Sequence, residues 1–176
     1  MNKNKWCRVV ILLVISMTLP AVAHSQGAGK SKAGAAFAQL ASLVGEWQGT
    51  QDGTGTEIAL TYTLTANDSV LMEESRPSDG PPMITMISVD GDHLVATHYC
   101  SVRNQPQMAT GPINDPQKSV LAFSFVRITG MNTPDDWHNT GVEMHLDDRD
   151  HLSQIWSWKY QGKTGTIGFH FARKKA

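Results

Sequence analysis

The sequence predicts an all-β protein, a closed up-and-down antiparallel barrel of about ten strands that follows one short helix. Two observations support this. After Gly45 no helical period appears, and short segments rich in β-branched and aromatic residues alternate with turn residues about every ten positions. So many antiparallel neighbours in one chain favour a barrel or a sandwich, and closing the sheet removes edges that would otherwise pair with other chains.

The first 23 residues have the pattern of a secretory signal peptide. Lys3, Lys5 and Arg8 precede an apolar stretch at 9–19, and small residues at 21–23 form a cleavage site. The apolar stretch is about half of the roughly 20 residues that a membrane-spanning helix needs. We therefore expect export to the periplasm or the extracellular space, with no membrane span.

Cleavage would leave about 150 residues, enough for one domain. We expect 24–34 to form a flexible linker and 35–176 to form the barrel. Without the three cations of the leader, the formal charge of −1 becomes −1 − 3 = −4, which argues against nucleic acid as a partner. Only Cys100 remains, so an intrachain disulfide is impossible, and we expect a monomer or a homodimer.

The segment AAFAQLASLVG predicts the helix, because Phe37, Leu40 and Val44 recur at helical spacing and Gly45 is a suitable stop. The clearest strand is TEIALTYTLT, in which apolar and polar residues alternate. The predicted strands are 46–51, 56–65, 69–75, 83–89, 92–99, 105–110, 118–126, 138–146, 151–160 and 164–173.

Turn residues predict the register of the last three strands. With Gly162-Lys163 as a two-residue turn, Trp156 lies opposite Phe169. A three-residue turn at 148–150 places Met144 opposite Gln154. In this register one face of the sheet carries the large apolar side chains, namely Val142, Met144, Leu146, Leu152, Trp156, Trp158, Ile167, Phe169 and Phe171. We expect a shift of either turn by one residue to destroy this division of the two faces.

This aromatic face indicates a ligand cavity, because a barrel of eight or more strands has room for a small ligand. In the alternative interpretation the same side chains simply fill the barrel. Gln154 is polar on an inward face, so it needs a buried partner or a ligand group. The predicted apolar wall consists of Met144, Trp156, Trp158, Phe169 and Phe171.

The stretch LVATHYCSVRNQPQM places several polar residues where a strand ends. Asn104 and Gln105 either satisfy the loop backbone or hold a ligand at the mouth. With Asp90-Gly91 as a turn, His98 shares a face with Leu94, and both faces of that hairpin are apolar enough to leave its direction open. His98 and Cys100 together provide too few ligands for a metal, so we expect none.

Glu73 and Glu74 point to opposite faces of one strand, so one of them is a candidate for burial. A buried carboxylate would have a raised pKa and would serve as an acid, a base or a ligand anchor. A salt bridge with Arg76 or Arg103 is the alternative. An isomerase or hydrolase that uses His98 and a buried glutamate on a small hydrophobic substrate is therefore a second hypothesis.

Two motifs resemble the calycins, the group of lipocalins, fatty-acid-binding proteins and nitrobindin-like barrels. LVGEWQGT resembles their first strand, and FHFARKK resembles their last. The resemblance implies that Trp47 closes the barrel floor, that Arg173 stacks on it, and that the helix caps the same end. ITMISVDGDHLVATHYCSVRNQPQM and DRDHLSQIWSW more closely resemble bacterial secreted DUF1579-like, lipocalin-like proteins.

We therefore expect a binding protein that holds a small apolar or amphiphilic molecule inside the barrel, with no catalysis and no cofactor. Nitrobindin-like barrels bind haem through a histidine near the end of the last strand, where this chain has His170. The predicted register turns His170 outward, so haem is the less favoured alternative.

Overall fold

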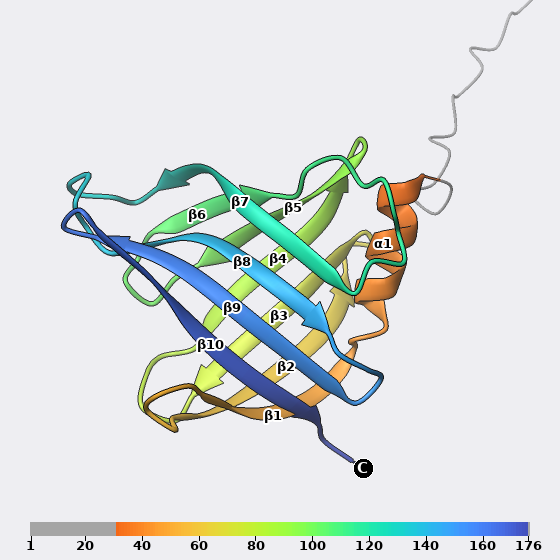
Figure 1. Cartoon of the computed structure of the whole chain (residues 1–176), viewed down its shortest axis with the longest axis horizontal. Coiled ribbons are helices and arrows are strands. Elements are labelled where there is room, and N and C mark those ends of the chain that lie inside the picture. The colour runs from red at the N-terminus through yellow and green to blue at the C-terminus, as the bar shows by residue number, and fades with distance from the viewer. Residues whose placement is uncertain (1–30, 176) are drawn as a thin grey trace, which may run out of the picture.

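Ten strands follow one another around a closed ring in the computed structural model, which describes residues 31–175 (Figure 1). Each strand pairs antiparallel with its neighbours in the chain, and β1 pairs with β10 to close the barrel. The predicted fold class is therefore confirmed. The strands are β1 (Gly45–Gln51), β2 (Glu57–Thr65), β3 (Val70–Pro77), β4 (Met83–Asp90), β5 (His93–Tyr99), β6 (Gln105–Ala109), β7 (Val120–Thr129), β8 (His138–Leu146), β9 (His151–Tyr160) and β10 (Lys163–Arg173).

The helix α1 (Lys32–Ala41) lies at one end of the barrel (Figure 1). Ser31 caps it, because its hydroxyl oxygen accepts a hydrogen bond from the Gly34 amide at 2.9 Å. The helix therefore begins inside the segment 24–34 that we predicted to be a linker, and 32–34 are helical. The predicted signal peptide and the rest of that linker lie outside the described residues. No described helix has both the length and the apolar character needed to cross a bilayer.

The predicted pairing of β8 with β9 is confirmed, with Met144 opposite Gln154. The pairing of β9 with β10 differs by two residues, because the turn is Gln161-Gly162 and Trp156 lies opposite Ile167. Both turn residues have positive φ, 48° and 72°, which is the type I′ geometry that favours glycine in second place.

The hairpin of β4 and β5 shows the same kind of difference. Its turn is Gly91-Asp92, so His98 lies opposite Thr85 and not opposite Met83. In both hairpins a turn moved by one residue shifts the pairing by two, and a shift of two leaves every side chain on its own face. Our expectation that such a move would destroy the division of faces is therefore wrong.

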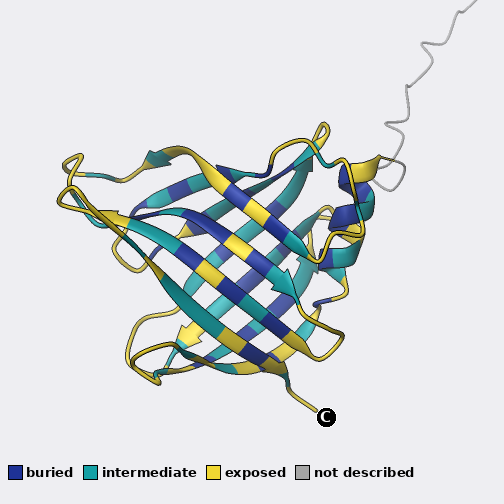
Figure 2. Cartoon of the chain, in the orientation of Figure 1, coloured by how far each residue is buried: buried dark blue, intermediate teal, exposed yellow. Residues whose placement is uncertain are grey.

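Burial alternates along the strands, which separates an inner from an outer face (Figure 2). At the end next to α1 the interior is packed with large apolar side chains. Trp47 is 1% exposed and donates its indole N–H to the Leu43 carbonyl at 2.8 Å. The Arg173 guanidinium lies 4.2 Å from the centre of the Trp47 ring. This end of the barrel is therefore closed by the contacts that the resemblance implied.

Candidate functional site

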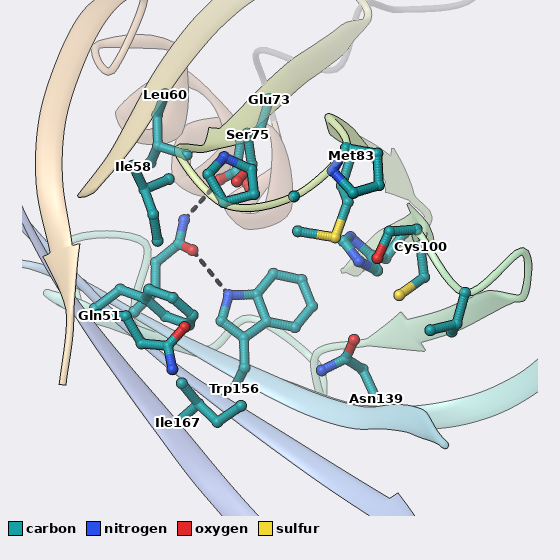
Figure 3. A pocket seen from close by; sticks show the side chains of 18 of the residues that line it. Gln51, Ile58, Leu60, Glu73, Ser75, Met83, Cys100, Asn139, Trp156 and Ile167 are labelled. Atoms are coloured by element: carbon teal, nitrogen blue, oxygen red, sulfur yellow. Dashed lines mark hydrogen bonds between the residues drawn. The ribbon is translucent and has the colours of Figure 1, made fainter. Parts of the chain in front are cut away.

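The other half of the barrel encloses a cavity of about 360 Å³ (Figure 3). Because the strands alternate in direction and α1 immediately precedes β1, the ends of β1, β3 and β5 lie away from the helix. Residues from these ends and from the loops after them surround the mouth. The apolar wall consists of Ile58, Leu60, Met83, Trp156, Ile167, Phe169 and Phe171.

A chain of buried hydrogen bonds forms the floor of the cavity. The Glu73 carboxylate accepts a bond from the Tyr62 hydroxyl and another from Gln154 Nε2 at 2.6 Å. Gln154 Nε2 also donates to Tyr62 Oη at 2.9 Å, and its Oε1 accepts from Trp156 Nε1 at 2.8 Å. Figure 3 draws the bond from Trp156. Gln154 therefore has the buried partners that its inward position requires, supplied by β2, β3 and its own strand.

The facing of His98, which the sequence left open, is inward. The side chain is 5% exposed, and its Nδ1 lies 3.0 Å from Thr85 Oγ1. The Thr85 hydroxyl also donates to Glu73 Oε1 over 3.5 Å, a long bond. The His98 ring packs at 51° against Trp156, with centroids 4.8 Å apart. We call Tyr62, Glu73, Thr85, His98, Gln154 and Trp156 the floor network.

Burial shifts the pKa values of the ionisable groups in this network. Loss of water raises the pKa of Glu73, while its bonds from Tyr62, Gln154 and Thr85 act in the opposite direction. Burial, and then the Glu73 charge, raise the pKa of Tyr62 well above its usual value. Burial lowers the pKa of His98 to about 4, so this imidazole is neutral at pH 7. None of the residues lining the cavity in the described chain is a lysine or arginine.

The structure brings together five of the predicted ligand-binding residues, which all line the cavity: His98, Gln154, Trp156, Phe169 and Phe171. Met144 and Trp158 lie on the predicted inner face of the sheet, but neither residue lines the cavity. Met144 is 2% exposed and belongs to the packed core. The Trp158 indole is half-buried and covers Gly165, the residue opposite it, where an added Cβ would collide with the ring.

Asn104 and Gln105 lie outside the cavity lining and support loops instead. Asn104 is buried and donates from Nδ2 to the Trp137 carbonyl at 2.7 Å. Gln105 Nε2 donates to the Arg103 carbonyl at 3.0 Å. Because Trp137 lines the cavity, Asn104 helps to position the mouth although it does not itself belong to the lining.

Of the two adjacent glutamates, one is buried and the other forms a salt bridge, so both predicted alternatives occur. Glu73 is inward and 3% exposed, whereas Glu74 points outward and pairs with Arg76 at 2.7 Å. Sequence reasoning missed Tyr62 and Thr85 as partners of Glu73. The signal that could have identified them is register, since Tyr62 and Thr85 lie directly opposite Glu73 on β2 and β4.

The described histidines lie apart from one another, and His170 faces outward. In residues 31–175 no three His, Cys, Asp or Glu side chains are grouped to hold a metal ion. The His170 side chain is 64% exposed on the outer face and contacts Ser153 Oγ at 3.1 Å and Asp52 at 3.4 Å. His170 therefore does not fit the haem contact that the nitrobindin resemblance implies.

Comparison with known proteins supports the barrel and nothing finer. No family model and no curated protein matches the chain. Rv2717c from M. tuberculosis superposes with a TM-score of 0.54 at 13% identity, over 80% of this chain and 98% of that one. A protein of unknown function from the DUF3598 family of Nostoc punctiforme gives 0.52 at 15% identity, over 77% of this chain. The match covers about half of the Nostoc protein, 49%. At these identities the likeness shows the fold alone.

Proposed function

We propose that this protein binds a small, largely apolar molecule inside the barrel and does not transform it. The observation that carries the proposal is the cavity of about 360 Å³, which lies within the size range of small-molecule sites. Its wall is divided between a majority of aromatic and aliphatic side chains and a smaller number of polar side chains, which lie at the floor and near the mouth. This division is typical of a pocket in which apolar contact supplies affinity and polar contact fixes orientation.

The floor network supports the proposal because its internal hydrogen bonds are already in place. Gln154 is held through both ends of its amide, and Trp156 is held through its indole nitrogen. A side chain that is already fixed loses little conformational entropy when a ligand arrives. Trp156 therefore presents a rigid aromatic surface to a ligand, and contact with a large ring contributes strongly to binding.

A matched pair of tryptophan variants tests the proposal. Trp156 lines the cavity, whereas Trp158, two residues along β9, lies against Gly165 outside it. We expect N-phenyl-1-naphthylamine to bind the wild type saturably and to quench its tryptophan fluorescence. Trp156→Phe should weaken binding about tenfold, since it removes ring contact and leaves Gln154 Oε1 without its donor.

Trp158→Phe should leave the dissociation constant of the probe unchanged. Native mass spectrometry of freshly purified protein gives a second readout, a co-purified mass that Trp156→Phe loses. If the wild type binds neither the probe nor any co-purified molecule, the cavity is not a binding site. Equal weakening by both variants would place the probe elsewhere on the barrel.

A second candidate is an enzyme that uses His98, as the sequence suggested. The observation that favours it is the chain from His98 Nδ1 through Thr85 to Glu73, which orients the imidazole as the orienting group of a catalytic base does. The pKa of His98, lowered to about 4, makes it a weak base at neutral pH. Binding without turnover is therefore the better supported function. Turnover of a hydrophobic ester that His98→Phe abolishes would reverse this order.

We also propose that the barrel is of the calycin type, related to the DUF1579-like secreted proteins, and that the protein is exported. The stacking of Arg173 on Trp47, with α1 against the same end, supports the calycin relation. The cationic, apolar and small-residue pattern of residues 1–23 supports export. N-terminal sequencing of the protein from a periplasmic or culture fraction tests export and should begin near His24.

A further inference from the structure

The floor network uses its own hydrogen-bond donors internally. Both N–H bonds of the Gln154 amide are taken, by Glu73 and by Tyr62. The Tyr62 hydroxyl donates to Glu73, and the Trp156 indole N–H donates to Gln154. The groups that remain free to meet a ligand at this floor are therefore hydrogen-bond acceptors.

The tautomer of His98 follows from the same accounting. A threonine hydroxyl has one proton, and we assign the Thr85 proton to the bond with the Glu73 carboxylate, which can only accept when it is ionised. The contact between Thr85 Oγ1 and His98 Nδ1 then needs the proton on Nδ1. His98 Nε2 is left with a lone pair, and no residue of the described chain donates to it. Since His98 is only 5% exposed and lines the cavity, we take the cavity as the space that Nε2 faces.

The charges around the cavity have one sign. Glu73 at the floor and Asp79 near the mouth are acidic, and the lining in the described chain includes no lysine or arginine. A buried carboxylate needs a cation or several donors to replace its water. A ligand carboxylate would find no lysine or arginine in this lining, and at the floor it would lie close to the Glu73 carboxyl.

We propose that the ligand carries a hydrogen-bond donor without negative charge, an amine or a hydroxyl, and that His98 Nε2 accepts a hydrogen bond from this donor. This inference rests on the proposed function and narrows the ligand class. It distinguishes the pocket from one built for fatty-acid anions, in which a cationic side chain would be expected to meet the carboxylate. The ligand's apolar part then lies along Trp156 and Phe169 toward the mouth.

Ligands with one chain and different head groups test the inference. We would measure 1-decanol, 1-decylamine, decanoate and decyl methyl ether by calorimetry at pH 7 and moderate salt. The ether accepts but cannot donate, and the anion has no proton to give. We expect the better of the two donor ligands to bind at least about tenfold more tightly than decanoate and the ether. The ratio of the dissociation constants of 1-decylamine and 1-decanol then shows which donor the site prefers.

Two further measurements locate the effect. His98→Phe keeps a ring against Trp156 but removes the acceptor, so the advantage of the donor ligands should fall to within about threefold. His170→Phe changes a residue on the outer face, so it should leave the affinity advantage of the donor ligands unchanged. In the wild type, the ¹⁵N resonance of His98 Nε2 should move when a donor ligand binds and stay in place with the ether.

The outcomes separate the two levels of the argument. If no decyl compound binds and N-phenyl-1-naphthylamine does not bind either, the proposed function fails. If N-phenyl-1-naphthylamine binds but no decyl compound does, the head-group inference fails alone. If decanoate or the ether binds as tightly as the alcohol and the amine, the cavity is a binding site but the head-group inference is wrong. An unchanged Nε2 resonance on saturation with decanol or decylamine would likewise overturn the role of His98.

Discussion

The two ends of the barrel are built from the same strands but differ in what fills them. Next to α1, Trp47, Leu71 and Met144 are almost fully buried and belong to one apolar core. At the other end the strands enclose about 360 Å³, with the floor network at its base. The difference indicates that the packed end stabilises the fold while the hollow end is available for a ligand.

This division has a physical basis in the side chains that meet inside. In the packed half the inward positions are aliphatic or aromatic, so dispersion contacts close the space. At the middle of the barrel, Glu73, Gln154 and Tyr62 meet and must bond to one another. Polar groups held in fixed geometry cannot spread to fill the space above them, and that space remains open.

The largest expected effect is a difference in stability between the two ends. Leu71→Ala removes a fully buried side chain from the packed half and should lower the free energy of unfolding by about 2–5 kcal/mol. Met83→Ala removes an equally apolar side chain that lines the cavity and is only half-buried, so it should cost about 1 kcal/mol or less. Urea unfolding followed by tryptophan fluorescence measures both. Equal losses would mean that the hollow end is packed as tightly as the other.

The next effect depends on pH and arises in the hollow end, where Glu73 and His98 are buried. The pKa of His98 is about 4 in the folded state and near 6.5 when unfolded, so the unfolded chain binds more protons between these values. Stability from this group is complete above pH 6.5 and is lost as the pH falls toward 4. The loss should reach about 3 kcal/mol relative to His98→Phe.

Glu73 acts in the opposite direction, because its raised pKa favours the folded state as the pH falls. Comparison of wild type with His98→Phe isolates the histidine, since both proteins keep Glu73. Urea unfolding at pH 7, 5.5 and 4 gives the free energy of unfolding of each protein at three pH values. His170→Phe, which changes an exposed histidine, is the control. Parallel curves for wild type and His98→Phe would show that His98 is accessible to water in the folded state.

The strands could be predicted from sequence because their signals are local. Alternation in TEIALTYTLT and the three-residue turn at 148–150 each require only adjacent residues, and both appear as expected. β7 runs to Thr129, three residues beyond its predicted end. The reason is a bulge where β6 and β7 shift register between Gln107 and Met108, which leaves Val126 without a partner. Nothing in the local pattern marks that bulge.

The site was only half accessible to the same reasoning. The inward position of Gln154 follows from its parity on β9, and so does its need for a partner. The partners themselves, Glu73 and Tyr62, are 81 and 92 residues away in the chain. Their meeting depends on how many strands close the ring and with what stagger, which no single hairpin determines. Met144 shows the converse error. Its parity on β8 correctly places it inside the barrel, but parity does not determine its depth along the barrel axis, and Met144 lies in the packed core instead of in the cavity wall.

The smallest expected effect concerns the closure of the packed end. Arg173 stacks on Trp47 and donates to the carbonyls of Val44 at 3.0 Å and Ser42 at 2.9 Å. Lysine has one compact ammonium and cannot make this planar contact and both bonds together. Arg173→Lys should therefore lower the free energy of unfolding by about 1–2 kcal/mol, measured by urea unfolding.

The neighbouring Lys174 provides the matched control, because its exposed pair with Glu46 at 2.9 Å lies at the same end. Lys174→Ala should leave stability unchanged within error. Arg173→Lys should also leave the affinity of the cavity for its probe unchanged, since the packed half separates the two sites. If Arg173→Lys also weakened binding of the probe, closure of the packed end by Arg173 would influence the shape of the cavity. The two ends would then form one cooperative unit.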